Sequence, residues 1–190
     1  KGFLGNFIYN YFKINNIKIE HLNTRLEDKD LYHQIKNINP KYIICAAGIV
    51  GKPNRDWCNI NPLKTIETNI LSSYNLAVFC QENNIKICFF GTIGIFNSKL
   101  DNKIYEDYDI PNNLSHVYLL SKYTFEFMVK DFENVLVLRL GHCLSLKYNA
   151  KNLLTKIVKF RKVHDEKMSI TILEQLFPYL IHMLKTQKGI

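Results

Sequence analysis

Two residue types that can move a proton stand four positions apart in the segment Tyr118-Leu-Leu-Ser-Lys122. On a helix, positions i and i+4 lie on one face, so the phenol and the ammonium would be neighbours. A positive charge beside a phenol lowers its pKa, which lets the phenol exchange a proton with a carbonyl oxygen near neutral pH. Thr92 follows the apolar run 85–90 and can offer a hydroxyl to the same oxygen. The trio predicts carbonyl chemistry, and the alternative is a chance spacing in a chain with 11 tyrosines.

Short apolar runs that alternate with helical patterns must position these three residues. The runs of strand type cover 17–22, 42–47, 85–90 and 135–140, and the helical patterns cover 2–12, 28–38, 62–83, 118–131, 152–161 and 173–185. This alternation predicts an α/β fold, a Rossmann-type doubly wound parallel sheet with helices on both faces. Ligands of such sheets bind beyond the carboxyl ends of the strands, so we expect one site among the loops that begin at Gly48, Gly91 and Gly141.

The chain opens on two glycines, in Gly2-Phe3-Leu4-Gly5, directly before the first helical pattern. Glycine at this place lets the backbone approach a pyrophosphate at a helix N-terminus, although two glycines before a helix also occur as a simple turn. A complete fingerprint needs a third glycine and a preceding strand, and we expect both to lie before residue 1. We expect a dinucleotide-binding domain over residues 1–140, and an incomplete part of a substrate-binding region over residues 141–190.

Composition narrows the function classes. The formal net charge is +8, but the lysines are scattered rather than clustered, which argues against a nucleic-acid partner. The longest apolar runs are too short to span a membrane, so no membrane association is expected. The five cysteines form no C-x-x-C pair, and three of them lie in apolar runs, which favours a reducing, cytoplasmic setting. The histidines have no metal-ligand spacing, so we expect no metal site.

Several segments together resemble the bifunctional epimerase/reductase of UDP-rhamnose synthesis, in the extended short-chain dehydrogenase/reductase superfamily. They are Ala46-Ala-Gly-Ile-Val-Gly-Lys-Pro-Asn-Arg-Asp-Trp-Cys58, Thr65-Ile-Glu-Thr-Asn-Ile70, Gly91-Thr-Ile-Gly-Ile-Phe96 and Tyr118-x-x-x-Lys122. The chain is similar, more distantly, to dTDP-4-dehydrorhamnose reductases. The resemblance covers nearly the whole chain, and the segment 51–58 is its most specific part.

The resemblance implies a nucleotide-sugar 4-keto-reductase that uses NADPH or NADH. The substrate would be a UDP- or dTDP-linked 4-keto-6-deoxy sugar, with Tyr118 protonating the new alkoxide and Lys122 also bonding the nicotinamide ribose. A homodimer is a further expectation. The residues implied in cofactor binding are Gly2, Phe3, Leu4, Gly5, Arg25, Ala46, Ala47, Gly48, Tyr118 and Lys122. Those implied at the substrate are Asn54, Trp57, Thr92, Ile93, Gly94 and His142.

At two positions this chain departs from the family pattern, which limits the residue roles that the resemblance implies. Gly94 stands where the family places an epimerisation cysteine, and glycine can move no proton, so 3,5-epimerase activity is in doubt although Lys156 matches the partner lysine. The segment Gly141-His142-Cys143 replaces an Arg-Met-Pro run, where His142 could serve as a proton donor or be an ordinary loop residue. The alternative function is therefore a non-catalytic, reductase-like binding or regulatory subunit.

Overall fold

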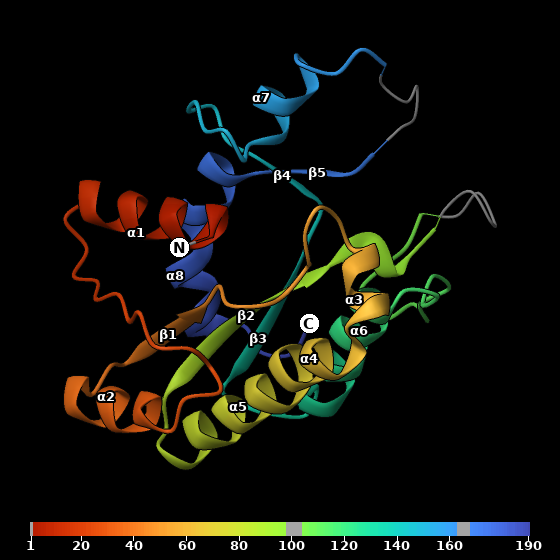
Figure 1. Cartoon of the computed structure of the whole chain (residues 1–190). Helices are drawn as coiled ribbons and strands as arrows, with labels where there is room; N and C mark the ends of the chain where they lie inside the picture. The colour runs from red at the N-terminus through yellow and green to blue at the C-terminus, as the bar shows by residue number, and fades with distance from the viewer. Residues whose placement is uncertain (1, 98–103, 163–167) are drawn as a thin grey trace.

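The computed structural model describes residues 2–97, 104–162 and 168–190, and its centre is a three-stranded parallel sheet (Figure 1). The strands are β1 (Tyr42–Cys45), β2 (Lys86–Thr92) and β3 (Val135–Leu140), in the spatial order β1-β2-β3. Ile44 lies opposite Cys88, and Cys88 lies opposite Leu136, so one register runs across the sheet. The predicted α/β class with a parallel sheet is confirmed.

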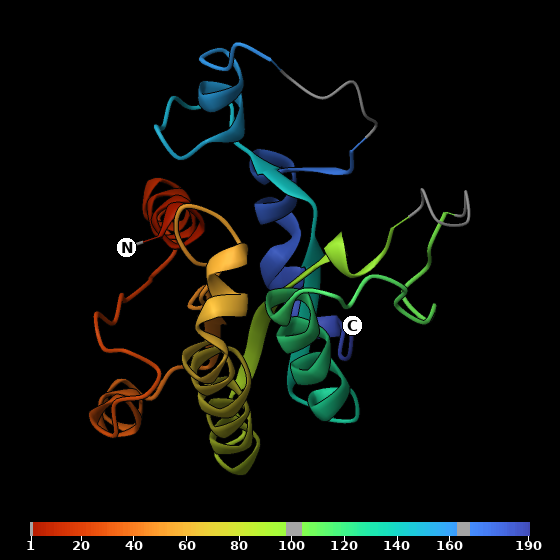
Figure 2. The same ribbon diagram turned by 45° about the vertical axis from the view of Figure 1, so that its right-hand side comes forward.

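Helices cover both faces of the sheet because successive strand residues point to opposite sides. Ile87 and Phe89 of β2 pack with α2 (Asp30–Ile38), α5 (Ser73–Glu82) and α6 (Val117–Val129). Cys88 and Phe90 pack on the other face with α1 (Phe3–Ile14) and α8 (Leu173–Thr186). Figure 2 shows the sheet between these two layers. The alternation of the two faces explains why the strands read as continuous apolar runs.

The long helical pattern that starts at Pro62 is one helical stretch with a change of pitch inside it. It consists of α4 (Pro62–Ile66), a π-helical segment η1 (Glu67–Ser72) and α5, and the short α3 (Asp56–Ile60) precedes it. Pro62 lies at the first helical position, where its missing N–H costs no hydrogen bond. The π segment was not predicted, because a single wide turn leaves no clear mark in apolar periodicity.

The strand predicted over residues 17–22 is not formed, and these residues have no regular secondary structure. β1 is an edge strand, and a cavity of about 910 Å³ lies along its outer side. The cavity is lined by residues 17–24 across from β1, and by residues of α1, α2 and α8. A strand needs a neighbouring backbone for its hydrogen bonds, and residues 17–22 border this cavity instead.

A smaller parallel pair follows β3, formed by β4 (His142–Leu144) and β5 (Ile170–Ile172), and neither strand was predicted. Between them lies α7 (Leu153–Ile157), which is shorter than the predicted helix over 152–161. A 3-10 turn, η2 (Ile93–Ile95), follows β2. Within the described parts of the chain, no helix has the length and apolar character needed to cross a membrane.

Candidate active site

Helix α6 carries Tyr118 and Lys122 in its first two turns. His116 is the N-cap residue of α6, but its side chain makes no capping hydrogen bond. The side chain of Asn59, on α3, caps the helix instead. Asn59 Oδ1 accepts a hydrogen bond from Val117 N at 2.9 Å, and its Nδ2 lies 3.1 Å from His116 Nδ1. A side chain from another helix therefore fixes where α6 begins, which places Tyr118 one residue inside it.

Lys122 points from α6 toward the carboxyl ends of β1 and β2. Its Nζ donates a hydrogen bond to Phe90 O at 2.8 Å, and a Cβ built on Gly48 would lie 3.4 Å from the same nitrogen. Burial lowers the pKa of Lys122, while Cys45 and Glu126 act in the opposite direction. The ammonium therefore lies near the carboxyl edge of the sheet, where ligands of parallel sheets bind.

Tyr118 corrects one expectation. Burial raises the pKa of Tyr118 to about 12, with Cys58 and Cys143 adding to the shift and Arg55 opposing it. Desolvation of the phenol is the largest cause of the shift, so the lowering expected from Lys122 is not found. At neutral pH the phenol keeps its proton, which is the form that a proton donor needs.

Thr92 ends β2 and caps the 3-10 turn that follows. Its Oγ1 accepts a hydrogen bond from Gly94 N at 3.1 Å, and Asn113 Nδ2 donates to Gly94 O at 2.8 Å. A Cβ at Gly94 would lie 3.2 Å from Leu119 Cδ2 and 3.3 Å from Thr92 Oγ1. The loop thus packs closely on α6, and position 94 offers no group for proton transfer.

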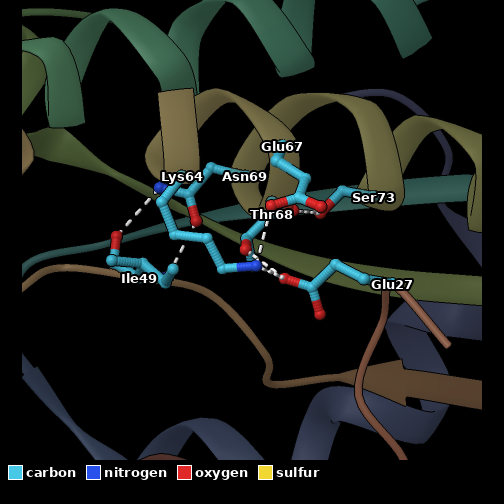
Figure 3. Close-up of polar contacts among 7 residues, drawn as sticks. All are labelled: Glu27, Ile49, Lys64, Glu67, Thr68, Asn69 and Ser73. Carbon is cyan, nitrogen blue, oxygen red and sulfur yellow. Dashed lines mark hydrogen bonds and ion pairs between the residues drawn. The ribbon is translucent and has the colours of Figure 1, made fainter. Parts of the chain in front are cut away.

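Asn69 of η1 joins the loop after β1 to α6, and Figure 3 shows its two contacts with Ile49 of that loop. Its Oδ1 accepts from Ile49 N at 2.7 Å, and its Nδ2 donates to Ile49 O at 2.8 Å and to Ser121 Oγ at 3.1 Å. Ser121 lies between the two predicted catalytic residues of α6 and was not itself predicted. π-helical turns are frequent at functional sites, and here the π turn aims Asn69 at both elements.

The preceding residue of η1, Thr68, reaches a different loop (Figure 3). Its hydroxyl donates to Glu27 Oε1, and Lys64 Nζ lies 3.2 Å from that oxygen. Burial raises the pKa of Glu27, but hydrogen bonds from Thr68, its own backbone and Lys64 outweigh burial and leave the pKa below its ordinary value. Glu27 is two residues from Arg25, which is exposed, so η1 also holds the segment that carries this residue implied in cofactor binding.

The predicted glycine segment lies at the N-terminus of α1, with Gly2 as the N-cap and no acidic residue in the first turn. Phe3 and Leu4 pack into the core between α1 and α8. A Cβ on Gly5 would lie 3.6 Å from Ala46 Cβ, so the start of α1 meets the end of β1. The described backbone thus brings the predicted glycines and residues 46–48 to the same side of the sheet.

The remaining predicted residues lie farther along the loops. Asn54 Oδ1 accepts from Asp56 N at 3.0 Å, and Trp57 packs on Gly51, where a Cβ would come within 2.5 Å of Trp57 Cβ. Ile93 lies in η2 beside Gly94. His142 and Lys156 are exposed on β4 and α7, and Figures 1 and 2 both place α7 apart from α6. The structure therefore does not bring Lys156 to Tyr118.

A buried ion pair one helical turn after Lys122 was not predicted from the sequence. Glu126 of α6 is fully buried, and Arg139 Nε of β3 lies 2.9 Å from its Oε2. Arg139 also donates from Nη1 to Asp107 O at 2.9 Å and lies over the Phe96 ring. Two signals were available in the sequence: an acid four residues after Lys122, and an arginine inside an otherwise apolar strand.

The sheet with helices on both faces, and the half-buried Tyr118 and Lys122 one helical turn apart at its carboxyl edge, define a Rossmann-type protein of the short-chain dehydrogenase/reductase class. The chain belongs to the NAD dependent epimerase/dehydratase family, whose model matches residues 2–179. The family resemblance stated from the motifs is thereby confirmed.

Individual relatives agree with this assignment. The chain is 30% identical over 97% of its length to a bifunctional dTDP-4-dehydrorhamnose 3,5-epimerase/dTDP-4-dehydrorhamnose reductase of Arabidopsis thaliana, and it spans 64% of that relative's length. Among solved structures it is similar to the UDP-rhamnose synthase of Acanthamoeba polyphaga mimivirus, with a TM-score of 0.87, 24% identity and coverage of 98% of this chain and 70% of that one. It is also similar to a dTDP-4-dehydrorhamnose reductase of Bacillus anthracis in complex with NADP, with a TM-score of 0.81, 18% identity and coverage of 99% and 69%. At these identities, the two structures support the fold.

Proposed function

We propose that this chain forms the reductase part of a nucleotide-sugar 4-keto-reductase that uses NADPH or NADH. The observation that carries the proposal is the placement of Tyr118 one helical turn from Lys122 on α6, with the Lys122 ammonium held against Phe90 O near the carboxyl end of β2. A ketone reduction requires an acid for the new alkoxide, and a protonated phenol is such an acid.

The residues at the start of α1 and the end of β1 fit a dinucleotide. Gly5 leaves room above Ala46, and the α1 N-terminus presents free N–H groups with no acidic side chain in the first turn. Gly2, Gly5, Arg25 and Lys122 would hold the cofactor, and Phe3, Leu4 and residues 46–48 would border it. When bound, NAD(P)H supplies the hydride.

The chain's own residues account for the proton. Tyr118 would donate its phenolic proton to the alkoxide oxygen that forms at C4, and the nearby Lys122 charge would stabilise the phenolate left behind. Thr92 would orient the same oxygen with its hydroxyl. Asn69 would keep the loop at Ile49 and helix α6 in register during the reaction, because it bonds to both.

The names of the relatives support the substrate class. They act, by name, on dTDP-4-dehydrorhamnose and in UDP-rhamnose synthesis, so we propose a UDP- or dTDP-linked 4-keto-6-deoxy sugar. Asn54, Trp57, Ile93, Gly94 and His142 stay proposed substrate contacts. We propose no 3,5-epimerase activity for this chain, because Gly94 has no proton to transfer and Lys156 lies apart from α6.

We further propose a homodimer and a cytoplasmic location. Exposed apolar side chains on neighbouring helices support a dimer: Leu63 on α4, Leu71 on η1, and Leu120 and Phe127 on α6. The five free thiols support a reducing compartment. We also propose that residues 1–140 form the dinucleotide-binding unit and that 141–190 contribute to substrate binding, although α8 packs on the sheet as well.

The test is incubation of the protein with UDP-4-keto-6-deoxyglucose or its dTDP counterpart, NADPH or NADH, in D₂O. We expect oxidation of the coenzyme, a C4-reduced sugar and no deuterium at C3 or C5. Coenzyme binding without turnover on either substrate would instead favour the non-catalytic subunit. Sedimentation velocity of the wild type and of Leu63→Asp tests the dimer, which the charged variant should dissociate.

A further inference from the structure

A buried carboxylate lies one helical turn beyond Lys122, on the same face of α6. Glu126 has no exposed surface, and its Oε2 is bonded to Arg139 Nε at 2.9 Å. Its other oxygen, Oε1, is buried and has no hydrogen-bond partner in the described parts of the chain. A buried carboxylate oxygen without a partner is costly, so a position like this one calls for an explanation.

A glycine of β2 leaves the space that this oxygen occupies. A Cβ on Gly91 would lie 2.2 Å from Glu126 Oε1, so only glycine leaves space for the carboxylate there. Gly91 directly follows Phe90, whose carbonyl accepts the hydrogen bond from Lys122 Nζ at 2.8 Å. Lys122 and Glu126 therefore contact adjacent residues of the same strand from adjacent turns of the same helix.

The ionisable groups around Lys122 come from three elements. Cys45 ends β1, Glu126 and Tyr118 lie on α6, and Arg139 lies on β3 behind Glu126. Burial raises the pKa of the Cys45 thiol and of the Tyr118 phenol, so both are neutral near pH 7. Burial also raises the pKa of Glu126, while the Arg139 guanidinium at 2.9 Å and Lys122 act in the opposite direction. Glu126, paired with Arg139, is then the carboxylate among these groups whose negative charge opposes the desolvation of Lys122.

We propose that Glu126, held by Arg139 in the space left by Gly91, is a positioning residue that keeps the Lys122 ammonium charged and aimed at the active site. The role is electrostatic, because Oε2 is occupied by Arg139 and Oε1 lies in a region of low dielectric where a charge acts strongly. Arg139 also bonds Asp107 O, so the same pair fixes the segment that leads into α6. The expected effect of Glu126 on catalysis rests on the proposed reductase function. Its effect on the protonation of Lys122 can be measured without turnover.

The experiment follows the ¹³Cε chemical shift of Lys122 with pH in protein labelled with ¹³C-lysine. The Lys122 signal is assigned by its loss in Lys122→Arg. In Glu126→Gln, which keeps the side-chain shape and removes the charge, we expect the Lys122 titration midpoint to fall by about one pH unit or more. Glu133→Gln is the matched control, because it removes an exposed carboxylate that pairs with Lys188 at the surface.

Enzyme kinetics form the second readout. In Glu126→Gln the alkaline limb of the reductase pH profile should move to lower pH in parallel with the Lys122 titration, while Glu133→Gln keeps the wild-type profile. If Glu126→Gln does not fold, Glu126→Asp replaces it, because the shorter carboxylate is drawn back from Gly91 and should give a smaller shift in the same direction.

An unchanged Lys122 titration in the folded Glu126 variants would overturn the inference, whatever their activity. A wild-type protein that reduces neither sugar nucleotide would overturn the proposed function, whereas the titration result would still decide the electrostatic role.

Discussion

The two edges of strand β1 differ in packing: protein covers the inner edge, whereas the outer edge borders a cavity. On the inner side, β1 pairs with β2 in register, and Asn69 ties the loop after β1 to α6 with bonds of 2.7 to 3.1 Å. On the outer side, the same strand borders a cavity of about 910 Å³, and residues 17–24, which have no regular secondary structure, line the cavity across from it. The proposed catalytic groups belong to the inner side, and the proposed coenzyme loop lies on the outer side.

Because the two sides differ in packing, a substitution on one side should change stability and a substitution on the other should change ligand binding. Side chains on the inner side are surrounded, so adding or removing one atom disturbs several fixed partners. On the outer side there is room around Gly2 and Gly5, so the same changes should leave the fold intact and act on ligand binding.

Tyr118→Phe should have the largest effect. Removal of the phenolic proton donor should lower kcat by about 10³-fold, within the range known for a lost general acid, while coenzyme affinity stays near the wild-type value. Coenzyme oxidation and coenzyme fluorescence titration measure the two quantities. Tyr123→Phe, one turn later on α6, is the control and should keep wild-type turnover. Native turnover in Tyr118→Phe would show that another group is the acid.

Gly91→Ala tests how tightly the inner side is packed. The new methyl group would lie 2.2 Å from Glu126 Oε1 and 3.2 Å from Val137 Cγ1, and Arg139 holds the carboxylate in place. We expect the free energy of unfolding in urea to fall by about 3 kcal/mol. Gly2→Ala is the control, since nothing lies within 4 Å of the added carbon. Equal stability of Gly91→Ala and the wild type would contradict the assigned position of Glu126.

Gly5→Ala should separate stability from coenzyme binding on the outer side. Its Cβ meets Ala46 Cβ at an ordinary 3.6 Å, and alanine is a better helix former, so the free energy of unfolding should be unchanged or rise by up to about 0.5 kcal/mol. The methyl group would hinder the approach of a pyrophosphate, so we expect affinity for NADPH to weaken about tenfold. Unaltered affinity would place the pyrophosphate elsewhere.

Glu27→Gln tests the contact between η1 and the loop that carries Glu27, through the pH dependence of the free energy of unfolding. The pKa of Glu27 is below its ordinary value of 4.5, so its ionised form stabilises the fold above about pH 4.5, and this stabilisation disappears as pH falls through the lowered value. At pH 7 the variant should lose about 1 kcal/mol of unfolding free energy, and the gap to the wild type should close in acid. Glu67→Gln, at an exposed carboxylate, should show a smaller gap at both pH values. A gap for Glu27→Gln that does not change with pH would show that its charge is not involved.

The amino-acid order by itself determined the fold class and much of the proposed site. Apolar runs marked β1, β2 and β3 because strands buried on both faces need apolar residues throughout, and Tyr118 and Lys122 were identified by their helical spacing. The loop glycines and the segment 51–58 then indicated the family, which the match over residues 2–179 confirmed.

The tertiary structure decided what depends on neighbours remote in sequence. Residues 17–22 carry strand-forming side chains but form no strand, because strand formation needs a paired backbone. The pKa of Tyr118 is raised rather than lowered, because burial outweighs the nearby charge. Glu126 and Arg139 are 13 residues apart and meet only when α6 packs on β3. Spacing along the chain determines which groups share a helix face, whereas burial and cross-element partners determine which of them are charged.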